Sequence, residues 1–83
     1  MWLPHGRYVG ETDDASGLPS GVGTMYYGSG DVYAGMFSRG KPHGRGSLTS
    51  NRLVKVGNFT DGKLDGAHDV YNDVGVKLFS RDD

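Results

Sequence analysis

The stretch Tyr33–Gly46, YAGMFSRGKPHGRG, decides the fold because its spacing of glycines and aromatic residues recurs on both sides of it. A forward step of 22 residues carries its anchors Gly35, Phe37, Gly40 and Gly44 onto Gly57, Phe59, Gly62 and Gly66. A backward step of 23 residues carries Gly40, Gly44 and Gly46 onto Gly17, Gly21 and Gly23. Such a fixed period is typical of a repeat array, in which each unit packs against its neighbours.

Composition limits what the chain can be. Its 83 residues form one domain at most, with a small core, because only 35% of them are hydrophobic. Glycine makes up 15 of the 83 residues, roughly 18% against a usual ~7%, without the three-residue period of collagen. The absence of cysteine excludes disulfide frameworks, thiolate metal sites and thiol nucleophiles.

The sequence also indicates where the protein works. No run approaches the ~18 apolar residues of a membrane span. The apolar start, Met1–Pro4, is too short for the core of a signal peptide. We therefore expect a soluble intracellular protein, or one held within a macromolecular assembly.

Runs with strand composition alternate with turn residues along the chain. Glycines at this density would cost ~1 kcal/mol each inside helices, which argues against a helical fold. The runs that predict strands are Arg7–Glu11, Val22–Tyr27, Val32–Phe37, Arg45–Ser50, Leu53–Phe59, Ala67–Tyr71 and Val76–Phe79. Short connections make neighbours in sequence antiparallel neighbours in space. We therefore predict an all-β fold, an antiparallel meander of consecutive β-hairpins with about six or seven strands in an open, elongated, twisted sheet.

The central strand has two different faces. Successive side chains in a strand point to opposite sides, which separates Tyr33, Gly35 and Phe37 from Val32, Ala34 and Met36. The missing side chain at Gly35 leaves a gap between the two rings. We expect a large side chain of a paired strand, or a ring of the adjoining unit, to fill it. Loops are predicted at residues 38–44 and 61–66.

These residues resemble MORN repeats, whose pattern is Tyr-x-Gly-x-aromatic-x-x-Gly-x-x-x-Gly-x-Gly. Residues 33–46 match every anchor, with Phe37 where tryptophan is commonest. The resemblance covers about residues 6–80 and divides a single domain, 1–83, into units of about 8–31, 32–53 and 54–75 with a closing strand, 76–80. The departures are Lys55 for the opening tyrosine and His68 for the last glycine of the third unit, Thr12 for an aromatic residue, and two extra residues before Gly17.

The resemblance implies a rod-like or gently curved hairpin array without catalytic apparatus. Members of the family act as protein-binding scaffolds or dimerising assembly elements, and in some proposals contact acidic phospholipids. We expect a non-catalytic protein–protein interaction module, a structural or adaptor component of a larger assembly such as a cellular complex or a virus particle. The alternative is peripheral association with acidic phospholipid membranes through the basic central repeat. The expected partner is a protein or a second copy, rather than nucleic acid or a small-molecule substrate.

Residues that could carry chemistry form no recognisable site. The serines lie mostly in turns, and none has the context of a nucleophile elbow. The histidines His5, His43 and His68 form no pair at metal-binding spacing. Residues 40–46 lack the Gly-Lys-Ser/Thr of a phosphate loop and open no helix. We therefore predict no catalytic residue, no metal and no cofactor.

A basic band in the middle of the chain is the first candidate for binding. Residues 39–55 carry a charge of +5 without any acid, whereas residues 1–38 and 56–83 each sum to −3. Candidate contacts for an anionic partner are Arg39, Lys41, Arg45, Arg52 and Lys55. Anionic headgroups or an acidic protein would add roughly 1 kcal/mol for each well-placed base. The alternative is a solvated surface whose bases lie at opposite hairpin ends.

An aromatic face is the second candidate. A single-layer sheet cannot cover both of its own faces, so one apolar face should meet a terminal segment, another copy or a partner. Candidate contacts for a protein partner are Trp2, Tyr27, Tyr33, Phe37 and Phe59. The alternative is that these rings only pack the sheet. Trp2 could fold back as a cap or anchor the chain in a neighbour.

Overall fold

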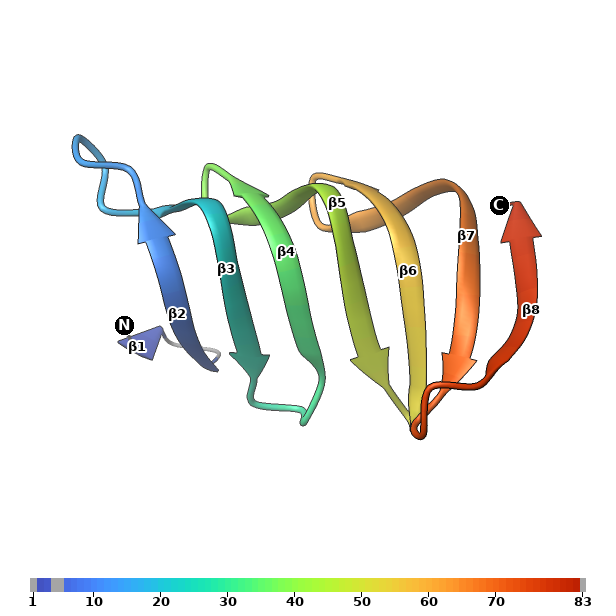
Figure 1. The fold of residues 1–83 in the computed structure, drawn as a ribbon. Coiled ribbons are helices and arrows are strands. Elements are labelled where there is room, and N and C mark those ends of the chain that lie inside the picture. Colours follow the sequence, from blue (N-terminus) through green and yellow to red (C-terminus); the bar gives the residue numbers. More distant parts are fainter. Residues whose placement is uncertain (1, 4–5, 83) are drawn as a thin grey trace.

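A computed structural model describes residues 2–3 and 6–82 and shows one sheet whose eight strands follow one another in chain order (Figure 1). The strands are β1 (Trp2–Leu3), β2 (Gly6–Thr12), β3 (Pro19–Tyr27), β4 (Val32–Ser38), β5 (Lys41–Ser50), β6 (Leu53–Thr60), β7 (Lys63–Asn72) and β8 (Lys77–Asp82). Every neighbouring pair is antiparallel. The sheet is open, since β1 and β8 form its two ends, and its extents are 40 × 23 × 16 Å. The predicted all-β meander is confirmed.

The turns on one side of the sheet are tighter than the sequence predicted. β5 already begins at Lys41 and β7 at Lys63. The predicted loops over residues 38–44 and 61–66 are therefore wrong, and the turns are only Arg39–Gly40 and Asp61–Gly62. Both residues of each turn have positive φ, 54° and 84° in the first turn and 50° and 88° in the second. This conformation matches the twist of the flanking strands, which can pair up to the turn itself.

The β5–β6 turn is strained because it has the same conformation without a glycine. Asn51 and Arg52 have φ of 52° and 63°. The left-handed region costs an ordinary L-residue roughly 1–2 kcal/mol, and asparagine tolerates it better than arginine. We expect Arg52→Gly to raise the free energy of unfolding by about 0.5–1 kcal/mol, because relief of strain exceeds the entropy that glycine adds to the unfolded chain. Urea denaturation measures the change, and Arg52→Ala, which keeps the strain, is the control. Equal stability of the two variants would contradict the assignment.

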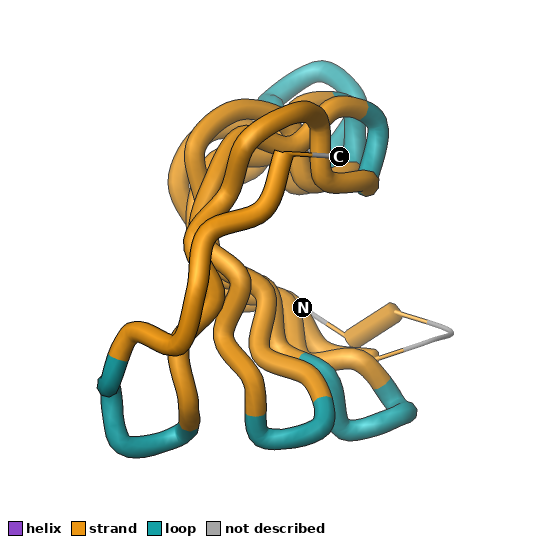
Figure 2. The backbone as a smooth tube through the Cα atoms, turned by 90° about the vertical axis from the view of Figure 1, so that its right-hand side faces the viewer, coloured by secondary structure: helices purple, strands orange, loops and turns teal. Residues whose placement is uncertain are grey.

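A row of glycines crosses the middle of the sheet. The register places Gly10 opposite Gly23, Gly23 opposite Gly35, Gly35 opposite Gly46, and Gly46 opposite Gly57. Register shifts follow this glycine row directly in the pairs β2–β3, β4–β5 and β6–β7. Such bulges bend strands. Figure 2 shows the result, a sheet that bends in mid-strand into a C-shaped cross-section.

The core lies inside this bend. Among the residues whose side chains the structure describes, six hydrophobic ones form the buried core, namely Tyr8, Met25, Tyr33, Phe37, Phe59 and Val70. A single-layer sheet can enclose a side chain only where it folds over it, so these residues define the inner face. Their rings meet edge to face, with centroids 5.0 Å apart for Tyr8–Phe37, 5.1 Å for Tyr33–Phe37 and 4.8 Å for Tyr33–Phe59.

Two expectations about the faces have different outcomes. The predicted division of the central strand's side chains between two faces is confirmed, because Tyr33 and Phe37 are buried while Met36 is 39% exposed on the opposite, outer face. The expectation that the aromatic face needs a cover from outside is wrong. The bend brings the two halves of each strand together over the rings, and the sheet itself excludes the water.

The glycine row makes room for tyrosine rings. The Tyr33 hydroxyl donates a hydrogen bond to the Met36 carbonyl oxygen at 2.8 Å, which draws the ring across Gly46. A Cβ atom at Gly46 would lie 2.5 Å from Tyr33 Cζ. Tyr8 repeats this arrangement over Gly23 and donates to the carbonyl oxygen of Glu11. The gap is thus filled by the ring of the same unit, which corrects the predicted source of the filling side chain.

The third unit replaces this arrangement by a compensating pair. Lys55 stands at the position of the tyrosine, and His68 lies opposite Gly57 at the position of the glycine. His68 is only 5% exposed, and its Nδ1 lies 3.3 Å from the Gly66 carbonyl oxygen. Because no tyrosine ring covers this part of the row, the histidine side chain has room there. The two departures from the repeat pattern therefore belong together: where the tyrosine is replaced by Lys55, the glycine can be replaced by His68.

Neighbouring units are also tied together at their turns. The Gly40 amide donates a hydrogen bond to the Pro19 carbonyl oxygen at 3.0 Å, and one unit later the Gly62 amide donates to the Pro42 oxygen at 2.9 Å. Each turn thereby satisfies a backbone acceptor of the preceding unit. This repetition keeps successive hairpins in one orientation.

Candidate functional site

The aromatic residues predicted to contact a partner lie mainly in the core. Tyr33, Phe37 and Phe59 are exposed by only 0%, 3% and 2%, so their rings present no surface to another protein, and their assignment as contacts is corrected. Tyr27 is half-buried and packs against this core. Burial, and then the charge of Asp31, raise the pKa of Tyr27. Trp2 belongs to β1, but its side chain lies outside the described part of the chain.

The five basic residues do not form one surface. Arg39 and Arg52 occupy turns at opposite ends of β5. Arg45 points to the outer face, since it follows Gly44 and precedes Gly46 of the glycine row, whereas Lys55 lies opposite Leu48 and Val70 on the inner face. Only Arg39 and Lys41 come together. The alternative of bases at opposite hairpin ends therefore describes this set better than a continuous band.

The two bases that come together share their hollow with an acid. The hollow lies between the β4–β5 and β6–β7 turns and is lined by Ser38, Arg39, Lys41, His43 and Asp61. It is open to solvent, where charges are strongly screened. The Asp61 carboxylate offsets part of the positive charge. This geometry gives the hollow little selectivity for anions.

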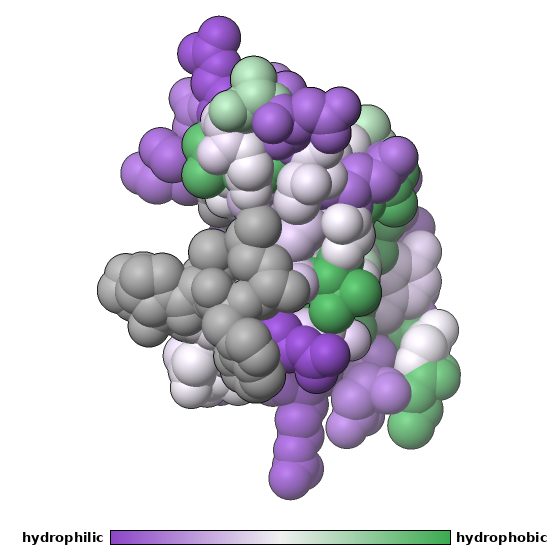
Figure 3. Space-filling model, turned by 90° about the vertical axis from the view of Figure 1, so that its left-hand side faces the viewer, coloured by the Kyte–Doolittle hydropathy of each residue, from purple (hydrophilic) through white to green (hydrophobic). Residues whose placement is uncertain are grey.

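The outer face carries exposed apolar side chains over β2, β3 and β4. Four large ones, which we call the outer-face patch, are Val9, Val22, Tyr26 and Met36, exposed by 50%, 58%, 47% and 39%. Val22 lies opposite Met36, and Val9 lies opposite Thr24, which stands between Val22 and Tyr26 on the same face of β3. The four side chains are therefore near neighbours on one surface. Figure 3 looks onto this end of the array, where hydrophobic side chains reach the surface between hydrophilic ones.

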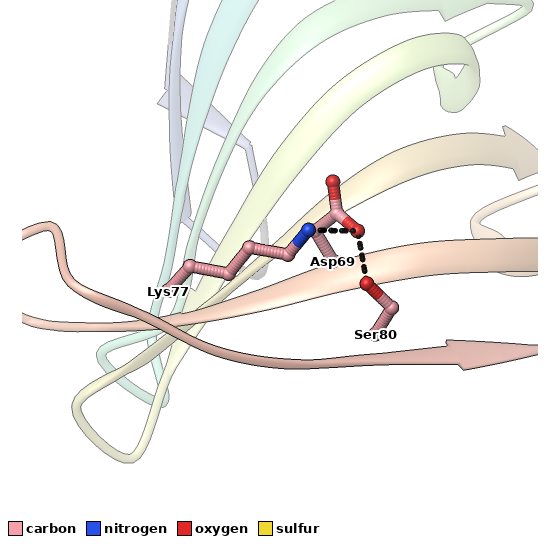
Figure 4. A network of polar contacts seen from close by, with 3 residues as sticks. All are labelled: Asp69, Lys77 and Ser80. Atoms are coloured by element: carbon pink, nitrogen blue, oxygen red, sulfur yellow. Dashed lines mark hydrogen bonds and ion pairs between the residues drawn. The ribbon is translucent and has the colours of Figure 1, made fainter.

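The outer face over β7 and β8 carries a polar cluster whose members are paired with one another. Asp69 of β7 accepts a hydrogen bond from the Ser80 hydroxyl at 2.7 Å and forms an ion pair with Lys77 Nζ at 3.5 Å (Figure 4). The hydrogen bond from Ser80, and then the positive charges of Lys77 and Arg45, hold the pKa of Asp69 below its usual value. Since this carboxylate already has partners on β8, the polar cluster offers less to a protein than the outer-face patch does.

Sequence reasoning missed the outer-face patch. The signal was present, because β2 and β3 place apolar residues on both faces, as in Val22 and Tyr26 on one side of β3 and Met25 and Tyr27 on the other. The contact candidates chosen from the sequence were aromatic residues, and most of these lie on the inner face. A strand that is apolar on both sides in a single-layer sheet predicts one buried and one exposed apolar surface. Which of the two faces is buried depends on the direction in which the sheet bends.

Residues 2–3 and 6–82 contain no group of three or more His, Cys, Asp or Glu side chains that could hold a metal ion. Within the same part of the chain there is no helix with the length and apolarity needed to cross a bilayer.

Comparison with known proteins gives two matches to one family. The family model described as MORN repeat matches residues 15–32 and residues 33–51. The second match begins at Tyr33 and contains the stretch on which the sequence resemblance rests. A comparison with curated proteins gave no significant match.

Proposed function

Because residues 15–32 and 33–51 of this chain are MORN repeats, known as non-catalytic modules of protein and membrane interaction, we propose that the chain is a protein-interaction module and not an enzyme. Its contact surface is the outer-face patch. The module serves as a structural or adaptor component of a larger assembly. The observation that carries this proposal is the set of four neighbouring apolar side chains that remain 39–58% exposed in a chain with a small core.

Burial of the patch supplies the driving force for binding. Removing a valine, methionine or tyrosine side chain from water stabilises a complex by about 1.5–3 kcal/mol when the whole side chain is buried, and the half-exposed side chains here retain about half of that. The sheet beneath them is held by paired strands on both sides of β3. A rigid surface of this kind loses little conformational entropy on binding.

Membrane association through the basic residues has weaker support. Charge-driven attachment to acidic phospholipids needs several bases on one surface, since each contributes roughly 1 kcal/mol. Arg39, Arg52 and Lys55 face three different parts of the molecule. The protein-binding alternative is therefore preferred.

Replacing Val22 and Met36 together by aspartate tests the proposed surface. Both side chains are exposed, so the fold should survive, while two charges in the apolar patch should weaken partner capture at least tenfold. The measurement is quantitative mass spectrometry of proteins retained by immobilised wild-type and variant chains. Val74→Asp is the matched control, since Val74 is 77% exposed in the β7–β8 turn, away from the patch. Partners retained equally by all three proteins would rule out this surface.

A further inference from the structure

Two methionines of the sheet differ sharply in burial, and the exposed one belongs to the outer-face patch. Met36 of β4 is 39% exposed. Met25 of β3 is only 5% exposed and belongs to the core cluster of buried rings. Since the chain contains no cysteine, methionine thioethers are the side chains that a peroxide oxidises most readily. The fold therefore leaves Met36 accessible to a dissolved oxidant and shields Met25 from it.

The neighbours of Met36 on the outer face are short. Val22 lies opposite it on β3. On the side of β5, Gly44 stands against it, since a Cβ atom at this glycine would lie 3.2 Å from Met36 Cβ and 3.5 Å from its Cγ. Along β4 the next residues on the same face are Ala34 and Ser38. Each of these residues is shorter than methionine, so none of them extends over the thioether.

Met25 has the opposite surroundings. It lies on the inner face of β3, where the register places it opposite Tyr8 of β2 and Tyr33 of β4. Both tyrosines are themselves buried, with exposures of 1% and 0%. An oxidant reaches Met25 only when the bend opens, and such an opening requires local or global unfolding. Burial should therefore slow the oxidation of Met25 well below that of Met36.

On the basis of this contrast we propose that Met36 is a site of reversible oxidation, at which a peroxide switches off the outer-face patch as a contact surface. The thioether sulfur donates an electron pair to one oxygen of hydrogen peroxide. The S–O bond forms as the O–O bond breaks, and the second oxygen leaves as water after a proton transfer. Methionine sulfoxide reductases reverse the change, with two thiols oxidised to a disulfide and the sulfoxide oxygen released as water. This inference rests on the proposed function and names a regulation of its surface.

The position of Met36 explains why its oxidation would act on binding. Met36 and the 58% exposed Val22 form one apolar contact surface across β3 and β4. A sulfoxide is polar, and covering its oxygen with an apolar partner leaves a hydrogen-bond acceptor without a donor. The side chains of Val22 and Ala34 supply no donor. Oxidation should therefore weaken binding of an apolar partner at least about tenfold, while the core on the opposite face stays intact.

Peptide mapping by mass spectrometry, after exposure of the purified chain to hydrogen peroxide, tests the site itself. In the folded chain Met36 should be oxidised at least about tenfold faster than Met25. In urea-unfolded chain the two rates should be similar, because only the fold distinguishes the two side chains. Equal rates in the folded chain, or a preference for Met36 that survives unfolding, would overturn the assignment.

Hydrophobic-interaction chromatography on a phenyl matrix measures the effect on the surface. Peroxide should shorten the retention of the wild type, and methionine sulfoxide reductases with dithiothreitol should restore it. Met36→Leu is the matched control, because leucine keeps the side chain apolar and the variant retains two of the three methionines. Its retention should change much less. Retention that shifts equally in both proteins, or in neither, would overturn the switch. So would loss of the β-sheet signal in far-UV circular dichroism, because oxidation would then act on the fold.

The capture experiment with immobilised chains separates this inference from the proposed function. Oxidised wild type should lose the same partners as the Val22→Asp, Met36→Asp double variant, and peroxide-treated Met36→Leu should keep them. If the double variant loses its partners while oxidised wild type keeps them, the contact surface stands and the switch is wrong. If the double variant keeps every partner, the contact surface and its regulation are both wrong, whereas preferential oxidation of Met36 would still establish the modification site.

Discussion

Gly46→Ala is expected to lower the free energy of unfolding by about 3 kcal/mol, at the upper end of what an overpacked core costs. The added Cβ would lie 2.5 Å from Tyr33 Cζ, so the ring has to leave its place across the glycine row. Its displacement breaks the hydrogen bond from the Tyr33 hydroxyl to the Met36 oxygen and the ring contacts with Phe37 and Phe59. A domain of this size has only about 4–12 kcal/mol of stability to lose. Thermal unfolding should move down by roughly 12–24 °C.

Two comparisons separate the steric cause from other effects of losing a glycine. Gly30→Ala introduces a Cβ with nothing within 4 Å, at a φ of 98°, and reports backbone strain without overlap. It should cost only about 1–2 kcal/mol. The second comparison copies the third unit, where a lysine and a histidine replace the tyrosine and the glycine. Gly46→His should be severely destabilising alone and less so combined with Tyr33→Lys. A double-mutant cycle without coupling would show that the ring does not occupy the glycine row.

Phe37→Ala is expected to cost about 3–5 kcal/mol, the usual range for removing a buried phenylalanine. The Phe37 ring is 3% exposed and links two units, because it meets both Tyr8 of the first and Tyr33 of the second. Its removal leaves a cavity inside the bend, which a single-layer sheet with paired strands can collapse only partly. The loss should also reduce cooperativity, since repeats that lose their interface begin to unfold separately. Chemical denaturation followed by far-UV circular dichroism measures both the loss of stability and the loss of cooperativity.

Phe79→Ala provides the control for Phe37→Ala. Phe79 is 47% exposed on β8 opposite Val70, so its truncation should cost less than about 1 kcal/mol. Similar losses in the two variants would mean that the aromatic row is not the core of the array. A Phe37→Leu variant should fall between them, since it restores much of the buried volume without the edge-to-face contacts.

The local rules of strand and turn formation were sufficient to predict the fold. The period of the glycines and aromatic residues specified a hairpin array, and alternation correctly separated Phe37 from Met36. The turn lengths were less accurate. Arg39 and Asp61 adopt the left-handed conformation, but their residue types do not indicate it as glycine does. The sequence therefore suggested loops at places where two-residue turns allow the strands to continue.

The candidate site was only partly accessible from the sequence. Of the predicted aromatic contacts, Tyr33, Phe37 and Phe59 proved to be core residues, while Val22 and Met36 of the outer-face patch were not singled out. Identity and spacing predict which residues share a face of a strand. They do not indicate whether that face is concave or convex, because burial depends on how the whole sheet curves.

The sequence by itself determined the repeat, the strand order and the membership of each face, because these depend on contacts between residues close in the chain. Only the tertiary structure decided that the sheet bends along the glycine row, that Tyr8 and Tyr33 fill the space above it, and that Val22 and Met36 remain exposed side by side on the outer face. The physical reason is that a bend is a collective property. It arises from glycines, bulges and rings on several strands at once, and it alone sorts two similar apolar faces into an interior and a surface.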